Sequence, residues 1–236
     1  MKLLAMLLCF VGMVSGCAVN LPFNTRLAYS HVSEAKKLAS NKLEPTSIEW
    51  SPADFLNRVD VQGASGFVGG GSQTRIPTGV ALANRITEAL DVSIGIDSSA
   101  KNLLELNIIS AESKFEYSAG MFNVTPGIDY GWCSLDVAFN YNGTKWNQKF
   151  IAEERDTTIG GTSQTGILEK VWDDIALQVA KNVSNKIEQS AKVQNYKGSE
   201  AYQLRLKEKA AEEAARIKAA AEEEAKKEER VRKYYE

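Results

Sequence analysis

Two segments of the chain repeat apolar residues every three or four positions, the spacing of one face of an α-helix. The first covers residues 78–90, with Thr78 in the position of an N-terminal cap. The second covers residues 167–187 and has the wider apolar face. That face consists of Ile167, Leu168, Val171, Trp172, Ile175, Val179, Val183 and Ile187. The pattern predicts two amphipathic helices, each of which must pack on another element.

Other segments favour strands, mostly because apolar and polar residues alternate. The predicted strands lie near residues 58–62, 92–96, 104–108, 135–141 and 144–151. Asn142-Gly143, between the last two, favours the type I′ turn of a β-hairpin. Strands adjacent in sequence and flanked by helices are typical of an α+β fold. We therefore predict an antiparallel sheet with two helices packed on one face.

After Gly198 the composition changes to Ala, Glu, Lys and Arg, without Gly or Pro through Glu236. Five pairs place Glu four residues before Lys or Arg, the favourable order on a helix. They are Glu212 with Arg216, Glu222 with Lys226, Glu223 with Lys227, Glu228 with Arg232 and Glu229 with Lys233. This predicts an extended charged C-terminal helix. Because its apolar residues keep no sustained heptad, a solvated single helix or a weak self-association surface is favoured over a strong coiled coil.

The N-terminus has the layout of a secretory signal: Lys2, an apolar run over residues 3–14, and small residues before Cys17. The run is shorter than the roughly 20 residues that a membrane-spanning helix needs. Its end, Val14-Ser15-Gly16-Cys17, resembles the lipobox of bacterial lipoproteins. The resemblance implies diacylglyceryl transfer to the Cys17 sulfur, cleavage before Cys17 and acylation of the new N-terminus.

Such an anchor would hold the mature protein on a membrane. Ala18 follows the cysteine where an aspartate would favour the inner membrane, so the resemblance implies the outer membrane, facing the periplasm. The alternative is an ordinary secretory signal cut elsewhere, with Cys17 unmodified. The expected organisation is a signal peptide over 1–16, a stalk over 17–46, a globular domain over 47–195 and the charged helix over 196–236.

Composition narrows the function. The formal net charge of −2 and the lack of a basic cluster in the globular part argue against a nucleic-acid partner. Cys133 is the one thiol left after cleavage and lipidation, so no intramolecular disulfide can form. In the alternating pattern of its strand it shares a face with Leu135 and Val137, which predicts a buried structural thiol.

Catalytic groups are sparse. The mature chain has one histidine, His31, expected to be solvated in the stalk, which excludes a multi-histidine zinc site or a histidine-based triad within one chain. The glycine-rich run 66–74 has neither phosphate-binding pattern. The acids that could serve a cell-wall hydrolase, the least favoured hypothesis, are better explained as solvated. They are Glu153, Glu154 and Asp156 near the last strand and Asp173 and Asp174 on the second helix. We predict a non-enzymatic protein without metal or cofactor.

An apolar loop over residues 118–132 offers a possible partner or ligand surface if it is exposed, and a lid on the core if it is not. The candidate residues are Met121, Phe122, Tyr130 and Trp132, with Trp172 of the second helix.

Over residues 60–188 the layout resembles small outer-membrane lipoproteins of the YajG type, from which the charged helix departs. We predict an interaction or assembly component of the cell envelope that binds another envelope protein through its C-terminal helix, with homo-oligomers left open. The alternative is an auxiliary lipoprotein of a transport system that holds a lipid or small molecule between the sheet and the second helix near Trp172.

Overall fold

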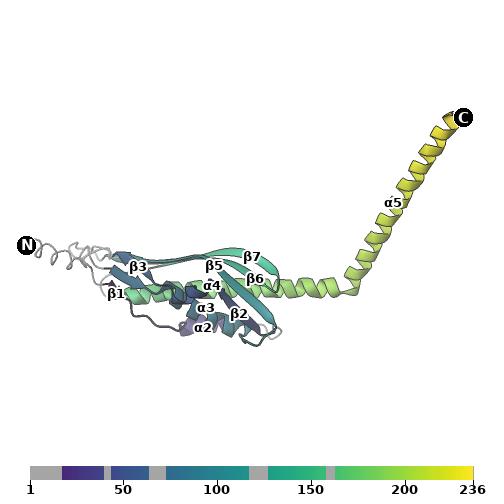
Figure 1. Ribbon diagram of the computed structural model, residues 1–236. Helices are drawn as coiled ribbons and strands as arrows, with labels where there is room; N and C mark the ends of the chain where they lie inside the picture. Colours follow the sequence, from purple (N-terminus) through teal and green to yellow (C-terminus); the bar gives the residue numbers. More distant parts are fainter. Residues whose placement is uncertain (1–17, 40–43, 64–72, 117–126, 158–162, 236) are drawn as a thin grey trace, which may run out of the picture. The chain divides into compact units, whose positions relative to one another are not determined.

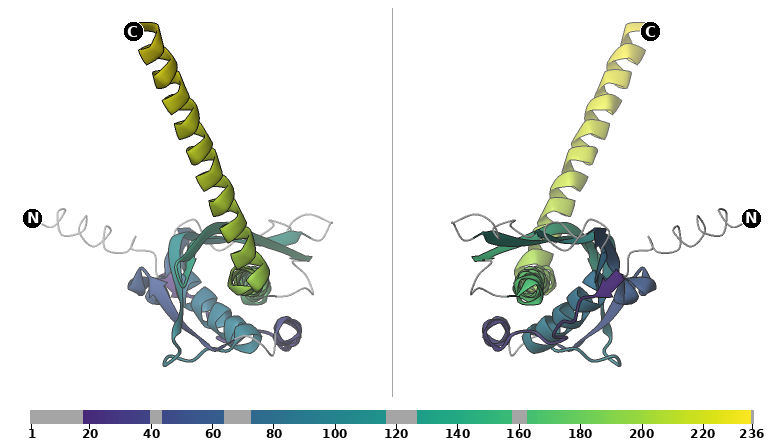
Figure 2. Two further views of the ribbon diagram at one scale, coloured as in Figure 1. Left: turned by 90° about the vertical axis from the view of Figure 1, so that its right-hand side faces the viewer. Right: turned by 90° about the vertical axis from the view of Figure 1, so that its left-hand side faces the viewer.

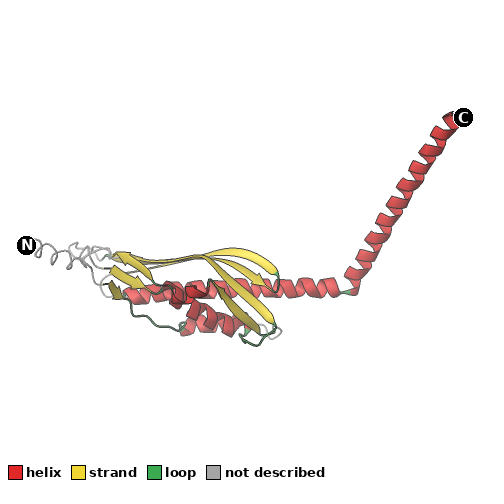
Figure 3. Cartoon of the chain, viewed as in Figure 1, coloured by secondary structure: helices red, strands yellow, loops and turns green. Residues whose placement is uncertain are grey.

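A computed structural model describes residues 18–39, 44–63, 73–116, 127–157 and 163–235. The chain divides into two compact units, Met1–Ile187 and Glu188–Glu236. The helices are α2 (Tyr29–Leu38), η1 (Ala53–Asn57), α3 (Thr78–Ile94), α4 (Gln164–Gly198) and α5 (Glu200–Tyr235). The strands are β1 (Ala18–Asn20), β2 (Thr46–Ser51), β3 (Asp60–Gly63), β4 (Gln73–Ile76), β5 (Asn102–Glu116), β6 (Ile128–Tyr141) and β7 (Thr144–Thr157) (Figures 1 and 3).

The main sheet of the first unit has the strand order β2-β5-β6-β7. β5, β6 and β7 are antiparallel neighbours. The hairpin between β6 and β7 is confirmed: Asn142 and Gly143 have φ angles of 48° and 88°, the left-handed conformation that this turn requires. β2 was not predicted, and it runs parallel to β5. Its sequence, Thr-Ser-Ile-Glu-Trp-Ser, has too few apolar residues to stand out as a strand.

α3 and α4, the two helices predicted from the sequence, pack on one face of the main sheet (Figure 2). Ile187 is 4% exposed, and the other seven apolar residues predicted for the inner face of α4 are completely buried. Burial of each large apolar side chain contributes about 1.5–3 kcal/mol. At the far end of this face, Trp146 Nε1 donates a hydrogen bond to Asn182 Oδ1 at 2.8 Å. α4 therefore follows the sheet along the length of β6.

β5 contains a bulge that the sequence did not reveal. Its pairing with β6 shifts between Ile108 and Ser110. Even-numbered residues from Leu104 to Ile108 are buried, whereas odd-numbered residues from Ala111 to Phe115 are buried after the shift. One extra residue thus resets the alternation and leaves Ile109 56% exposed.

The segment expected to form a stalk is instead part of the fold. β1 pairs with β4 in a second, three-stranded sheet of order β1-β4-β3. α2 contacts α3. Leu27 and Ala35 are buried, Ala35 completely, so the described part of residues 17–46 contributes to the core.

The strand predicted over residues 92–96 is wrong. α3 continues through Ile94 and ends at Gly95, whose φ is 77°. Leu90, Ser93 and Ile94 are buried together, which continues the helical spacing of the preceding turns. A segment of only five residues is too short for its apolar pattern to distinguish a strand from the end of a helix, and here the helix extends into it.

The second unit contains α5, a helix of 36 residues that confirms the predicted charged C-terminal helix. The described side chains of residues 203–222 are all exposed. Arg216 Nη2 lies 3.3 Å from Glu212 Oε1, one of the predicted pairs.

Candidate functional site

Tyr130 and Trp132 lie on the face of the main sheet opposite α4. Gly131 and Cys133 alternate with them and face the helix. A Cβ on Gly131 would lie 2.5 Å from Ile167 Cγ2, so glycine allows α4 to approach the sheet. Because side chains alternate along a strand, the two aromatic rings point away from the core.

Charged residues on the neighbouring strands surround these rings. Lys114 pairs across the sheet with Trp132, and its Nζ lies 5.3 Å from the ring centroid. Arg155 pairs with Tyr130, and its Cζ lies 5.2 Å from that centroid. The Tyr130 hydroxyl donates a hydrogen bond to Glu153 Oε2 at 2.9 Å. We call these five residues the aromatic patch.

The interactions within the aromatic patch are weak. Burial raises the pKa of Tyr130, and the hydrogen bond to Glu153 raises it further, so the phenol stays protonated at neutral pH. A protonated phenol is a poor nucleophile. Exposed cation–π contacts contribute only about 0.5–1 kcal/mol each, so both rings can exchange their cations for another partner at little cost.

The prediction that Trp172 contributes to a ligand surface is wrong. Trp172 is completely buried, and its Nε1 donates a hydrogen bond to Ser113 Oγ at 2.9 Å. Phe23 packs edge-on against the indole, with 5.8 Å between ring centroids. Arg85 Cζ lies 5.4 Å from the indole centroid on the α3 side. Protein groups therefore fill the space in which a ligand was expected.

Asp173 was predicted to lie on a solvated face, and this prediction is wrong. It lies in the helical interface, where its Oδ1 accepts a hydrogen bond from Arg85 Nε at 2.7 Å. Burial raises the pKa of Asp173, and Arg85 opposes that increase. The neighbouring Asp174 lies 2.9 Å from His31 Nε2, so His31 joins α2 to α4 instead of projecting from a stalk. An arginine within the apolar stripe of α3 was the sequence signal for this buried pair.

Of the remaining candidate acids, Glu153 and Glu154 lie on opposite faces, as the strand period predicts, and Asp156 shares the face of Glu154. Glu153 belongs to the aromatic patch, whereas Glu154 pairs with Lys170 of α4 at 2.8 Å on the opposite face. Among the described residues, no group of three or more His, Cys, Asp or Glu side chains is placed to hold a metal ion. Of the other predicted features, Cys17, Met121, Phe122 and most of the glycine-rich run 66–74 lie outside the described residues.

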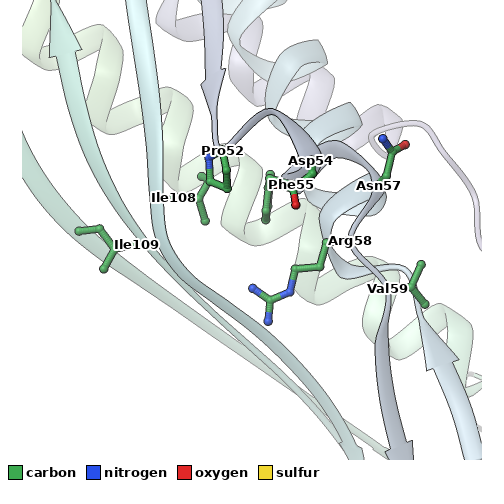
Figure 4. A pocket seen from close by; sticks show the side chains of 8 residues that line it. All are labelled: Pro52, Asp54, Phe55, Asn57, Arg58, Val59, Ile108 and Ile109. Carbon is green, nitrogen blue, oxygen red and sulfur yellow. The ribbon is translucent and has the colours of Figure 1, made fainter.

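A hollow of about 580 Å³ lies where β2 leaves β5 (Figure 4). β2 pairs with β5 only as far as Asn107, and the chain then turns away through η1. Arg58 extends toward β5, and its Nε donates a hydrogen bond to Asp60 Oδ1 at 2.9 Å. The lining residues are Pro52, Asp54, Phe55, Asn57, Arg58, Val59, Ile108 and Ile109. The sequence did not reveal this hollow, because it depends on β2 and on the bulge in β5.

No helix among the described residues has both the length and the apolar character needed to cross a membrane.

The sequence matches no protein-family model and no curated protein. Among solved structures, this chain is similar to a minor lipoprotein from Acinetobacter baumannii, with 10% sequence identity and a TM-score of 0.37. The match covers 60% of this chain and 91% of that one. Rare lipoprotein B from Shewanella oneidensis has 11% identity and a TM-score of 0.31, covering 65% and 97%. A putative lipoprotein from Caulobacter crescentus has 9% identity and a TM-score of 0.33, covering 70% and 97%. The likeness to YajG-type lipoproteins stays a prediction.

Proposed function

We propose that this protein is a lipid-anchored, non-enzymatic docking protein of the bacterial envelope, held on the outer membrane through Cys17 and facing the periplasm. The lipobox Val14-Ser15-Gly16-Cys17 supports the anchor. The observation that carries the docking role is the exposed helix α5 in a unit separate from the globular fold.

α5 combines a charged surface with a few exposed apolar side chains. Leu204, Leu206 and Ile217 are 59%, 46% and 66% exposed. The surrounding charges keep such a helix soluble, while burial of the three apolar side chains against a partner would contribute favourable free energy. A partner helix or groove with apolar pockets and charges of both signs fits this surface.

Mild crosslinking of the lipidated full-length protein in cells, followed by purification and mass spectrometry, tests the docking role. The test variant replaces Leu204, Leu206 and Ile217 with Ser. The matched control replaces three exposed alanines of the same helix, Ala210, Ala214 and Ala219, with Ser. We expect one envelope protein to be lost from the test variant and retained by the control. Equal recovery with both variants, or no partner with the native protein, contradicts the proposal.

A second candidate function, binding of a small amphiphile, is favoured by the hollow between η1 and β5. Phe55, Val59 and Ile109 provide apolar surface there, and Arg58 provides a cation near Asp60. Native mass spectrometry of the protein in gentle detergent tests it. A co-purified ligand that disappears in the Arg58→Ala variant supports binding, and a clean unliganded mass contradicts it.

A further inference from the structure

The lipidation site and the folded domain are joined without a linker. β1 begins at Ala18, the residue directly after Cys17. The two Cα atoms are therefore about 3.8 Å apart. β1 is hydrogen-bonded to β4, and Leu21 N donates a further hydrogen bond to the Arg75 carbonyl at 3.1 Å. An anchor at Cys17 thus holds the domain directly rather than through a flexible stalk.

The strand pairings show how far along the main sheet Ala18, the residue next to the proposed anchor, lies. Ala18 pairs with Gln73, and Gln73 pairs with Gly63. Gln62, the residue before Gly63, donates a side-chain hydrogen bond to the Ser113 carbonyl of β5. Ala18 therefore lies about one residue beyond the level of Ser113.

The direction of β1 follows from the same pairings. β1 is parallel to β4, and β4 is antiparallel to β3. β3 runs in the direction of β5, since Val59 lines the hollow with Ile108 and Gln62 reaches Ser113. β1 is thus antiparallel to β5, and Ala18 is the residue of β1 nearest the end of the sheet where β5 ends and β6 begins (Figure 1).

The first residues of β6 extend as far as this attachment point or beyond it. Cys133 pairs with Ser113, and Ile128 is five residues nearer the end, about 17 Å at 3.3 Å per residue. By the same count, Ala18 lies about 3 Å beyond Ser113. Ile128 therefore extends about 13 Å farther than Ala18, and Tyr130 extends about 7 Å farther.

We propose that this end of the domain, Ile128 together with the aromatic patch, rests in the lipid headgroup layer of the membrane that holds the anchor. The inference depends on the lipidation of Cys17 proposed above. The headgroup layer of one leaflet is about 5–8 Å thick, comparable with the calculated extension of Tyr130 beyond Ala18.

The exposed and half-buried side chains at this end match a lipid interface. Ile128 is 59% exposed despite its apolar side chain. Tyr130 and Trp132 are the residue types enriched at membrane surfaces. Lys114 and Arg155 lie over the two rings, where their charged ends can reach headgroup phosphates. Glu153 lies among them, so the patch carries both signs of charge and fits zwitterionic headgroups.

Fluorescence quenching by lipids tests the orientation. The full-length lipidated protein is reconstituted into phosphatidylethanolamine vesicles containing a doxyl-labelled lipid. A fluorophore is attached at Ile128→Cys or, in a second variant, at Thr157→Cys, its exposed cross-strand partner. The matched control carries the fluorophore at Lys145→Cys, at the opposite end of the same strand pair. The native Cys133 is buried and does not compete for the label.

We expect quenching at residues 128 and 157 to exceed that at residue 145 by at least threefold. Equal quenching at the two ends, or none at 128 and 157, overturns the orientation when intact mass confirms acylation. A mass without acyl chains refutes the anchor itself, so the two failures are distinguishable.

A linker variant tests the direct attachment. A flexible Gly-Ser linker of about 20 residues between Cys17 and Ala18 retains the acyl chains but frees the domain to move away. We expect quenching at residue 128 to fall by at least half. Unchanged quenching contradicts the conclusion that the short connection holds this end on the lipid.

Discussion

The buried pair of Arg85 and Asp173 joins the two helices that cover the sheet, and its loss gives the sharpest test of how they pack. Both side chains are almost completely inaccessible. Arg85 Nε donates to Asp173 Oδ1 at 2.7 Å, and Arg85 Nη1 donates to the Ala81 carbonyl at 3.3 Å. The guanidinium also lies over the Trp172 ring. Replacing Arg85 with Met retains much of the side-chain volume but removes the cation.

The Arg85→Met variant leaves Asp173 buried without its counter-ion. Breaking a buried pair costs about 3–5 kcal/mol, and protonation of the acid limits the loss. Protonating a carboxyl group whose unfolded pKa is about 3.9 costs about 4 kcal/mol at pH 7, but only about 1.5 kcal/mol at pH 5. We therefore expect the free energy of unfolding of the variant to fall by about 4 kcal/mol at pH 7. At pH 5, protonation of Asp173 should account for a loss of less than half of that.

The sign follows from proton linkage. Burial raises the folded-state pKa of Asp173, and Arg85 lowers it, so removing Arg85 raises this pKa further. An acid whose folded pKa exceeds its unfolded pKa contributes stability below the unfolded value and loses it as pH rises through the folded value. The difference from the parent must therefore grow between pH 5 and pH 7.

Equilibrium urea unfolding of the full-length protein, followed by tryptophan fluorescence, measures these differences. Lys170→Met is the matched control, because Lys170 pairs with Glu154 at the surface and its loss should cost under about 1 kcal/mol. The double variant Arg85→Met with Asp173→Leu should recover most of the parent stability. A loss below about 1 kcal/mol in Arg85→Met, or a loss equal at both pH values, would refute the reasoning.

Three further substitutions or treatments probe the packing of the sheet. Burial raises the pKa of the Cys133 thiol to about 12, so iodoacetamide at about pH 8 should leave this residue unmodified in the native protein. In concentrated urea the same reagent should add one adduct at Cys133, and intact mass measures both results. Gly131→Ala should cost about 1–3 kcal/mol in urea unfolding through its clash with Ile167, whereas Gly63→Ala, with open space around the added Cβ, should cost less. Gly143→Ala should cost about 1–2 kcal/mol by the same measurement, since its φ of 88° is unfavourable for residues with a Cβ; an unchanged midpoint would show that the turn relaxes.

The elements that the sequence predicts best are those whose signal is local. The Asn142-Gly143 turn needs only two residues with positive φ, and both have it. The apolar face of α4 repeats over more than five turns, so no other period fits it.

The features that sequence analysis missed depend on contacts between distant segments. β2 is recognisable only beside β5, because a parallel edge strand gains its hydrogen bonds from a partner more than 50 residues away. Asp173 is polar, so its place within α4 suggested solvent exposure; the compensating charge comes from Arg85, 88 residues earlier. The docking of α2 on α3 could not be inferred from so weak an apolar stripe, so its residues were assigned to a stalk.

The course of α4 separates the two ends of the first unit. Ile167 lies against Gly131 near the end of the sheet where β6 begins, and Asn182 accepts its hydrogen bond from Trp146 near the hairpin. From Gln164 to Ile187 the helix rises about 35 Å at 1.5 Å per residue. The chain therefore leaves this unit at the end opposite the proposed anchor.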